Sequence, residues 1–116
     1  MLFVTHDLGV VRRVAQRVAV MYLGRIVETG GSEALWSSPR HPYTRSLAES
    51  IPTGTQRWRE DLGRPRLEGE PPSPFEVPSG CRFHPRCPIA IDRCVRQDPA
   101  IRSFPPDVLV ACHLAE

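Results

Sequence analysis

Proline is the residue that most constrains how this chain can fold. All thirteen prolines in its 116 residues lie beyond Leu35. Proline has no backbone N–H to donate and fixes its own φ angle, so it interrupts helices and is excluded from central strands. The second half should therefore be mostly coil, which buries too little apolar surface to stay ordered alone. We expect a cross-link or a bound group, rather than a large core, to hold the second half of the chain together.

Four cysteines fall in that proline-rich half, namely Cys81, Cys87, Cys94 and Cys112. In a reducing compartment such a set is more often a group of metal or cluster ligands than a pair of disulfides. The spacing matches neither the Cys-x2-Cys knuckles of zinc fingers nor the ferredoxin patterns, so it does not select the metal. Unliganded buried thiols and disulfides remain alternatives. His84 and His113 are possible zinc ligands beside the cysteines.

Composition excludes several classes of function. The net charge is only +2, and arginines are interspersed with acids, so we expect no nucleic-acid-binding face. No apolar run is long enough to span a bilayer, and the first residues lack the pattern of an export signal. We therefore expect a cytosolic chain.

The first residues, Leu2 to Asp7, form a short apolar run that ends on a histidine and an acid. Its β-branched and aromatic residues favour a strand, which would place His6 at the carboxyl end where open α/β sheets bind ligands. Asp7 can cap the next helix, in which the apolar positions recur at helical spacing at Leu8, Val11, Val14 or Ala15, and Val18.

A β-hairpin is predicted next, because two β-type runs, Val18 to Tyr22 and Arg25 to Glu28, are joined through Leu23-Gly24. Gly30-Gly31 should end it. Two short helices follow. Ser32 can cap the first, which runs from Glu33 to Trp36, and Pro39 should stop it. Pro42 suits the first turn of the second, which places Tyr43, Leu47 and Ile51 on one face before Pro52. We expect the large apolar side chains of these helices to be core.

The remaining part changes character. From Thr53 to Ser79, glycines and prolines separate mixed charges and leave no apolar periodicity, which predicts a linker or a draped arm. Pro88 suits the first position of a short helix that includes Ile89, Ile91 and Cys94, with Cys87 in the preceding turn. Within one helix Cys87 and Cys94 would be separated by about 10 Å of rise, too far to share a site. Val108 to Ala111 should be a final strand that returns Cys112 to the other cysteines.

Taken together, these segments resemble the C-terminal part of an ATP-binding subunit of the oligopeptide/dipeptide ABC transporter family. The matching stretches are Thr5-His6-Asp7-Leu8-Gly9-Val10-Val11, Arg17 to Tyr22 with Gly24 to Glu28, His41-Pro42-Tyr43-Thr44, Gly69 to Pro74, and Gly80-Cys81 through Arg86-Cys87-Pro88 to Ala111-Cys112-His113. The Thr-His-Asp stretch occurs in ABC ATPases generally. The His-Pro-Tyr-Thr stretch and the four cysteines are more specific to this branch.

The resemblance implies an α/β fragment made of three parts. Residues 1–52 would be the terminal strand, helix and hairpin of a P-loop ABC ATPase domain, 53–79 a linker, and 80–116 a mostly irregular, cysteine-clustered C-terminal extension. His6 would correspond to the switch histidine that contacts the γ-phosphate of ATP. Cys81, Cys87, Cys94 and Cys112 would bind a [4Fe-4S] cluster, with Zn²⁺ as the alternative.

The family imports peptides, or in some members nickel, with ATP and Mg²⁺ bound by the full subunit. The implied partners are a second ATP-binding subunit, identical or paralogous, and membrane permease subunits, which would place the chain on the cytoplasmic face of the cell membrane. This chain has no phosphate loop, no ABC signature and no catalytic glutamate, so we expect a fragment that does not hydrolyse ATP alone.

The competing hypothesis is an independent interaction module in which the cysteines bind a metal or an iron–sulfur cluster. A free-standing hydrolase is a poor third hypothesis, because no serine or cysteine motif flanks a suitable base.

Overall fold

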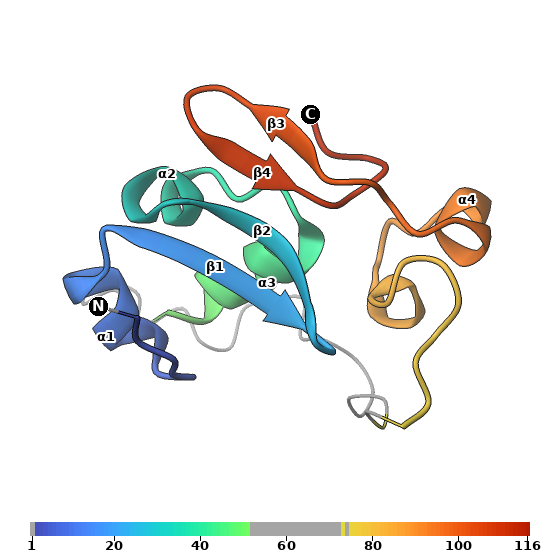
Figure 1. The fold of residues 1–116 in the computed structure, drawn as a ribbon, viewed down its shortest axis with the longest axis horizontal. Coiled ribbons are helices and arrows are strands. Elements are labelled where there is room, and N and C mark those ends of the chain that lie inside the picture. The colour runs from blue at the N-terminus through green and yellow to red at the C-terminus, as the bar shows by residue number, and fades with distance from the viewer. Residues whose placement is uncertain (1, 52–72, 74) are drawn as a thin grey trace, which may run out of the picture.

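The computed structural model describes residues 2–51, 73 and 75–116 (Figure 1). The elements in chain order are α1 (Leu8–Val14), β1 (Arg17–Tyr22), β2 (Arg25–Gly31), α2 (Ser32–Ser37), α3 (Pro42–Ser50), the 3-10 helix η1 (His84–Arg86), α4 (Asp92–Arg96), β3 (Arg102–Phe104) and β4 (Val108–Val110). The four strands form one antiparallel sheet in the order β1-β2-β4-β3. The predicted α/β class is confirmed.

The predicted hairpin is formed by β1 and β2. Tyr22 pairs with Arg25 across a two-residue turn, in which Leu23 has a φ angle of 48° and Gly24 one of 76°. Two positive φ angles at the centre of a two-residue turn match the right-handed twist of the flanking strands. Glycine takes such an angle without steric cost, which is why the Leu-Gly pair makes a tight reversal here.

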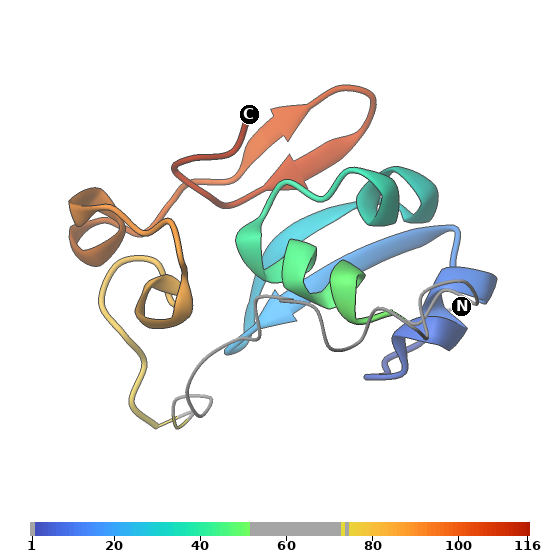
Figure 2. The same cartoon turned by 180° about the vertical axis from the view of Figure 1, so that it is seen from behind.

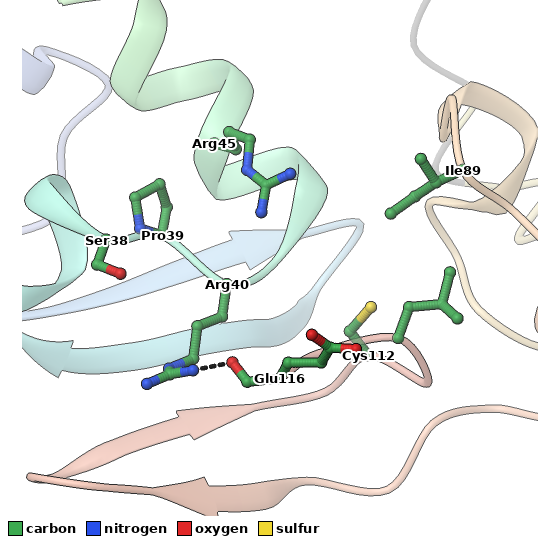
Figure 3. Close-up of a pocket in the computed structure, with 8 residues that line it drawn as sticks. Ser38, Pro39, Arg40, Arg45, Ile89, Cys112 and Glu116 are labelled. Carbon is green, nitrogen blue, oxygen red and sulfur yellow. Dashed lines mark hydrogen bonds between the residues drawn. The ribbon is translucent and has the colours of Figure 1, made fainter.

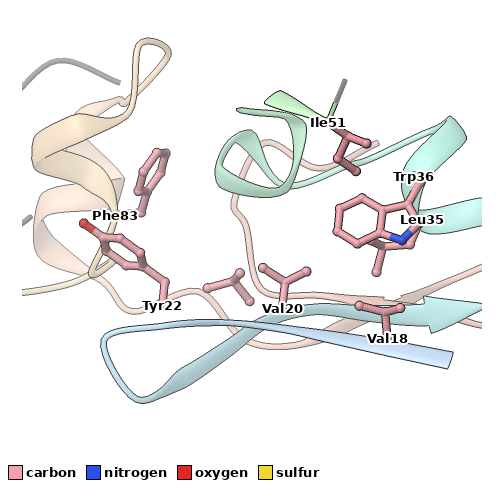
Figure 4. Close-up of a cluster of buried hydrophobic side chains, with 8 residues drawn as sticks. Val18, Val20, Tyr22, Leu35, Trp36, Ile51 and Phe83 are labelled. Atoms are coloured by element: carbon pink, nitrogen blue, oxygen red, sulfur yellow. The ribbon is translucent and has the colours of Figure 1, made fainter. Parts of the chain in front are cut away.

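The core lies between β1 and the helices α2 and α3. Residues of β1 alternate between exposed and buried, and the buried Val18, Val20 and Tyr22 face the helical side. They pack against Leu35 and Trp36 of α2 and against Ile51 after α3 (Figure 4). Seen from behind, α2 and α3 lie across this face of the hairpin (Figure 2). The expectation that Trp36 is core is confirmed, while Tyr43 and Leu47 are partly buried against the same cluster.

The sheet is completed by strands from the other end of the chain. β4 pairs with β2 through Glu28↔Val110 and Thr29↔Leu109, and β3 pairs with β4. The predicted strand at Val108 is therefore confirmed, whereas β3 was not predicted. An ion pair between Arg17 and Asp107 joins the start of β1 to the turn between β3 and β4.

The strand predicted at the N-terminus is wrong. Residues 2–4 are coil, and the side chains of Leu2 and Val4 are 91% and 89% exposed. A strand is stabilised by hydrogen bonds to a neighbouring strand, and within the described residues the sheet formed by β1 to β4 offers this segment none. β propensity alone does not form a strand.

Three local predictions also need correction. Pro88 does not start a helix, because α4 begins only at Asp92 and Pro88 lies in a turn. Ser32 is the first residue of α2, whose N-cap is Gly31 without a side-chain cap. Gly30 and Gly31 extend β2 rather than end it, and Gly30 lies against β4, where an added Cβ would be 3.0 Å from a methyl group of Val108.

Most of the linker predicted over 53–79, and Pro52 before it, lie outside the described residues. No helix in the described parts of the chain has the length and hydropathy needed to cross a bilayer.

Candidate functional site

His6 is the catalytic candidate. It is exposed and lies in a bend directly before α1. The next residue, Asp7, is the N-cap of α1, and its carboxylate accepts a hydrogen bond from the Val10 N–H at 3.2 Å. The Asp7 N–H in turn donates to Thr5 Oγ1 at 3.0 Å. The predicted cap is therefore confirmed, and it fixes the backbone beside His6, whose contact with a nucleotide remains a prediction.

All four predicted cysteine ligands are free thiols. Cys87 ends η1, Cys94 lies in α4, Cys112 follows β4, and Cys81 precedes η1. The Cys81 N–H donates a hydrogen bond to the Cys94 carbonyl at 2.7 Å, which joins the backbones of two of the four residues. The structure thus keeps Cys87 and Cys94 out of a common helix, as sharing a site requires.

The thiols influence one another electrostatically. Burial raises the pKa of Cys81, and negative charge on Cys94 and Cys112 would raise it further. Burial likewise raises the pKa of Cys87, to which Cys112, Cys81 and Cys94 add in the same direction. Since like charges raise a thiol pKa only when they are near, Cys81 and Cys87 each have other cysteines in their surroundings.

The thiols do not, however, form a site for a single ion. Within the described residues, which include every cysteine, no three side chains of the Cys, His, Asp or Glu type are placed to hold one metal ion. Neither the Zn²⁺ alternative nor the [4Fe-4S] cluster therefore gains support from the described side chains, and the ligand set remains a prediction. The two histidines considered as ligands bond to backbone instead: His84 Nδ1 lies 2.7 Å from the Cys81 carbonyl, and His113 Nε2 lies 2.7 Å from that of Gln97.

Phe83, between the first two cysteines, is almost completely buried, with 1% of its side chain exposed. Its ring centroid lies 5.2 Å from that of Tyr22, which Figure 4 shows beside it, 5.4 Å from that of Tyr43 and 5.7 Å from that of His41. These distances are typical of favourable aromatic pairs. The His-Pro-Tyr stretch thus helps to build a socket, formed by Tyr22, His41 and Tyr43. The ring of Phe83 fills this socket and so anchors residues 80–99, which are called the cysteine segment below.

Glu28 holds one side of this socket in place. Its side chain is fully buried in β2, and its two carboxylate oxygens accept the backbone N–H groups of Arg40 at 3.0 Å and of His41 at 2.9 Å. A buried carboxylate needs such donors to offset its lost hydration. The role of Glu28 could not be predicted from the sequence, because a glutamate in a short strand gives no sign that its partners are backbone groups in a later loop.

Polar contacts attach the cysteine segment to the end of the hairpin. Arg25 forms an ion pair with Asp98 and donates a second hydrogen bond to the Pro99 carbonyl at 3.0 Å. Arg82 donates to the Leu23 carbonyl in the hairpin turn. In Figure 1 the segment that carries α4 lies beside this turn.

Arg102 holds the residues around the last cysteine. Its guanidinium donates hydrogen bonds to the carbonyls of Cys112 at 2.7 Å and Ala115 at 2.9 Å, so it closes the loop after β4. Burial raises the pKa of the Cys112 thiol, and the positive charge of Arg102 opposes this increase with a smaller effect.

A cavity of about 320 Å³ lies next to Cys112 (Figure 3). It is lined by Ser38, Pro39, Arg40, Arg45, Ile89, Cys112, Leu114 and Glu116. Arg40 donates to the backbone carbonyl of Glu116 and stacks over the Phe104 ring at 4.7 Å. Arg45 is exposed and projects from α3 toward the opening. Cys112 thus lines the same cavity as Arg45 of α3 and Ile89.

His41 makes the socket sensitive to acid. Burial lowers the pKa of His41 to about 4, and its Nδ1 accepts a hydrogen bond from the Tyr43 N–H at 3.0 Å, which requires the neutral ring. In the unfolded chain His41 takes up a proton near pH 6.5. The free energy of unfolding should therefore be highest above about pH 6.5 and fall by about 3 kcal/mol as the pH drops to about 4. Denaturant unfolding between these pH values measures it.

The control for this pH dependence is His41→Asn, because asparagine can still cap α3 but does not titrate. The variant should lose most of the difference in stability between pH 6.5 and pH 4. An equal pH dependence in both proteins would assign the effect to carboxylates and contradict the role of His41.

The sequence of the chain matches a known family and several characterised or named proteins. The family described as "Oligopeptide/dipeptide transporter, C-terminal region" matches residues 27–94. The chain is similar to the "Probable peptide ABC transporter ATP-binding protein" of Sinorhizobium fredii, with 48% identity over 98% of this chain and 32% of that protein. It is also similar to the "Oligopeptide transport ATP-binding protein AppF" of Bacillus subtilis, with 46% identity over 97% of this chain and 34% of that protein.

The chain thus spans about a third of the length of these relatives. The matched residues include β2 from Val27 onward, the His-Pro-Tyr stretch and three of the four cysteines. From this match we conclude that the chain belongs to the oligopeptide/dipeptide transporter C-terminal-region family.

Proposed function

We propose that the chain is the C-terminal part of the ATP-binding subunit of a peptide ABC importer. The observation that carries this proposal is the similarity of nearly the whole chain, at 46–48% identity, to proteins named as peptide-transport ATP-binding subunits. Those names favour peptides over nickel as the solute. ATP and Mg²⁺ would be bound by the full subunit, since the residues present here include no phosphate loop.

Within that subunit, His6 is the residue proposed to contact the γ-phosphate. Its exposed position beside the Asp7 cap supports this role, because an exposed side chain on a fixed backbone is available to a ligand. The proposed partners are a second ATP-binding subunit and the membrane permease, and the proposed location is the cytoplasmic face of the membrane. In this function the chain supplies the catalytic His6 and part of the surface of the subunit, and other parts of the subunit bind the rest of the nucleotide.

We further propose that Cys81, Cys87, Cys94 and Cys112 hold a [4Fe-4S] cluster. Four free thiols in the proline-rich half, with the Cys81 N–H bonded to the Cys94 carbonyl, support this proposal, because thiolates are the ligands that such clusters take. When bound, such a group supplies either one-electron chemistry or a cross-link between segments. Such a cross-link would hold the proline-rich half together, as the sequence predicts.

The alternative of an independent module is less well supported. β4 and β2 share hydrogen bonds in one sheet, and Phe83 is buried in a socket made by β1 and α3. A segment with these contacts depends on residues 17–51 for its structure.

Anaerobic reconstitution of the chain with iron and sulfide tests the cluster. The reconstituted protein should be brown and contain about four irons per chain, as the cluster type implies. Cys87→Ser should remove most of the iron and the protease resistance of residues 80–116, because one ligand and the cross-link are lost. Ala90→Ser, an exposed position three residues away, is the control and should load normally. Stoichiometric zinc without iron or sulfide would contradict the cluster.

A further inference from the structure

Gly80 makes the closest backbone approach among the glycines of the described residues. Its φ angle is +65°, and a Cβ added there would lie 2.3 Å from the carbonyl oxygen of Cys94 and 2.7 Å from that of Val95. Real Cβ atoms are not found below 3.0 Å, and both obstacles are backbone atoms that cannot turn away. Any other residue at this position must therefore push residues 79–81 away from α4.

The residues on either side of Gly80 use this approach to cap α4. The last carbonyls of a helix have no partner within the helix. Ser79 Oγ donates to the Val95 carbonyl at 2.9 Å, and the Cys81 N–H donates to the Cys94 carbonyl at 2.7 Å. The same two bonds that satisfy the end of α4 therefore set the position of Cys81 relative to Cys94.

We propose that Gly80 is a positioning residue for the four-thiol set, since it permits the backbone contact that fixes Cys81 beside Cys94. The effect of Gly80 on cluster binding rests on the proposed function, namely that the four thiols hold a cluster. Its effect on the position of Cys81 does not. Gly80 does not bind that group. It determines where one of its four ligands lies, and no larger residue can do so without displacing the segment.

Three glycine-to-alanine substitutions in the full 116-residue chain separate the effect of backbone strain from the effect of the clash with α4. Gly80→Ala adds both backbone strain and the clash with α4. Gly24→Ala adds strain at a φ angle of +76°, but its nearest new contact is 3.8 Å away on the flexible side chain of Arg82. Gly31→Ala adds neither, because nothing lies within 4 Å of its Cβ and its φ angle is −61°.

The first measurement needs no metal. Hydrogen exchange of the Cys81 amide in the metal-free chain reports the bond to the Cys94 carbonyl directly. Gly80→Ala should speed this exchange by at least about tenfold relative to the unsubstituted chain, whereas Gly31→Ala should not change it. Gly24→Ala should change it only as much as it changes the exchange of amides throughout the sheet.

The second measurement is iron content after anaerobic reconstitution. Gly80→Ala should lower the iron per folded chain at least about twofold, and the two control variants should load like the unsubstituted chain. If the unsubstituted chain takes up no iron, the cluster proposal fails, while the exchange rate still decides the role of Gly80. Unchanged Cys81 exchange in Gly80→Ala, or full iron loading of that variant, would overturn the inference.

A further variant covers the case in which Gly80→Ala does not fold. Ser79→Ala removes the hydroxyl that bonds to the Val95 carbonyl without adding strain or a clash. It should raise Cys81 exchange several-fold, because one of the two bonds that hold the segment on α4 is lost. Exchange at the unsubstituted rate would contradict the proposed coupling between this cap and Cys81.

Discussion

Replacing His6 by alanine in the full-length subunit is expected to lower ATP turnover about 10² to 10⁴-fold and to leave ATP affinity nearly unchanged. A group that acts on the γ-phosphate in the transition state contributes mainly to the rate, because the rest of the nucleotide is held elsewhere. Turnover and nucleotide binding, measured on the same preparation, separate the two quantities. The 116-residue chain alone should show no ATP hydrolysis.

Arg13→Ala is the matched control for this experiment, since Arg13 is exposed in the neighbouring helix α1. It should change turnover little. Equal losses of ATP affinity and turnover in His6→Ala would assign His6 to ground-state binding. ATP hydrolysis by the 116-residue chain alone would show that other parts of the subunit are not needed to bind the nucleotide, which contradicts the proposal.

Replacing Phe83 by alanine should lower the free energy of unfolding by about 3–5 kcal/mol. The ring is almost fully buried against Tyr22, His41 and Tyr43, and its removal leaves a cavity at the contact between the cysteine segment and the hairpin. Denaturant unfolding measures the loss of stability. Limited proteolysis should show that residues 75–116 become susceptible first, because the polar contacts of Arg25 and Arg82 at the hairpin are weaker than the buried ring.

Phe75→Ala is the control for Phe83→Ala, because it makes the same change at an exposed side chain. Its side chain is 93% exposed, so Phe75→Ala should change stability by no more than about 0.5 kcal/mol. A similar loss of stability in both variants would mean that Phe83 does not anchor the segment.

The sequence was informative where structure depends on neighbouring residues. The β1–β2 hairpin follows from alternating apolar residues around Leu23-Gly24, and α3 follows from Pro42 at its first turn. Both signals are local, since turn geometry and helix starts are determined within a few residues. The Asp7 cap was predictable for the same reason.

Pairing between distant segments was not predictable. Residues 2–6 have strand propensity but no partner strand within the described residues, whereas Arg102–Phe104 has weak propensity and becomes β3 because β4 lies beside it. Pro88 was misassigned because a proline that suits the first helical position also suits the turn where it is found.

The candidate site was predictable in composition and not in geometry. The four cysteines are candidate ligands by their residue type alone, and their role as ligands stays a prediction. The residues that place them could not be predicted, because Phe83, Glu28 and Gly80 act through contacts made after folding. Phe83 and Gly80 flank Cys81 in the sequence, but nothing in their residue types distinguishes an anchor or a close approach from ordinary coil.

The pairing of β2 with β4 has a consequence for synthesis on the ribosome. Glu28 and Val110 are far apart in the sequence, so the edge of β2 that pairs with β4 stays uncovered until residues 108–110 have been made. Closing so long a loop is slow, and an uncovered strand edge is a template for pairing with other chains. Residues 108–110 thus also protect the nascent chain, and cells in which translation stops shortly before Val108 should accumulate it as aggregates.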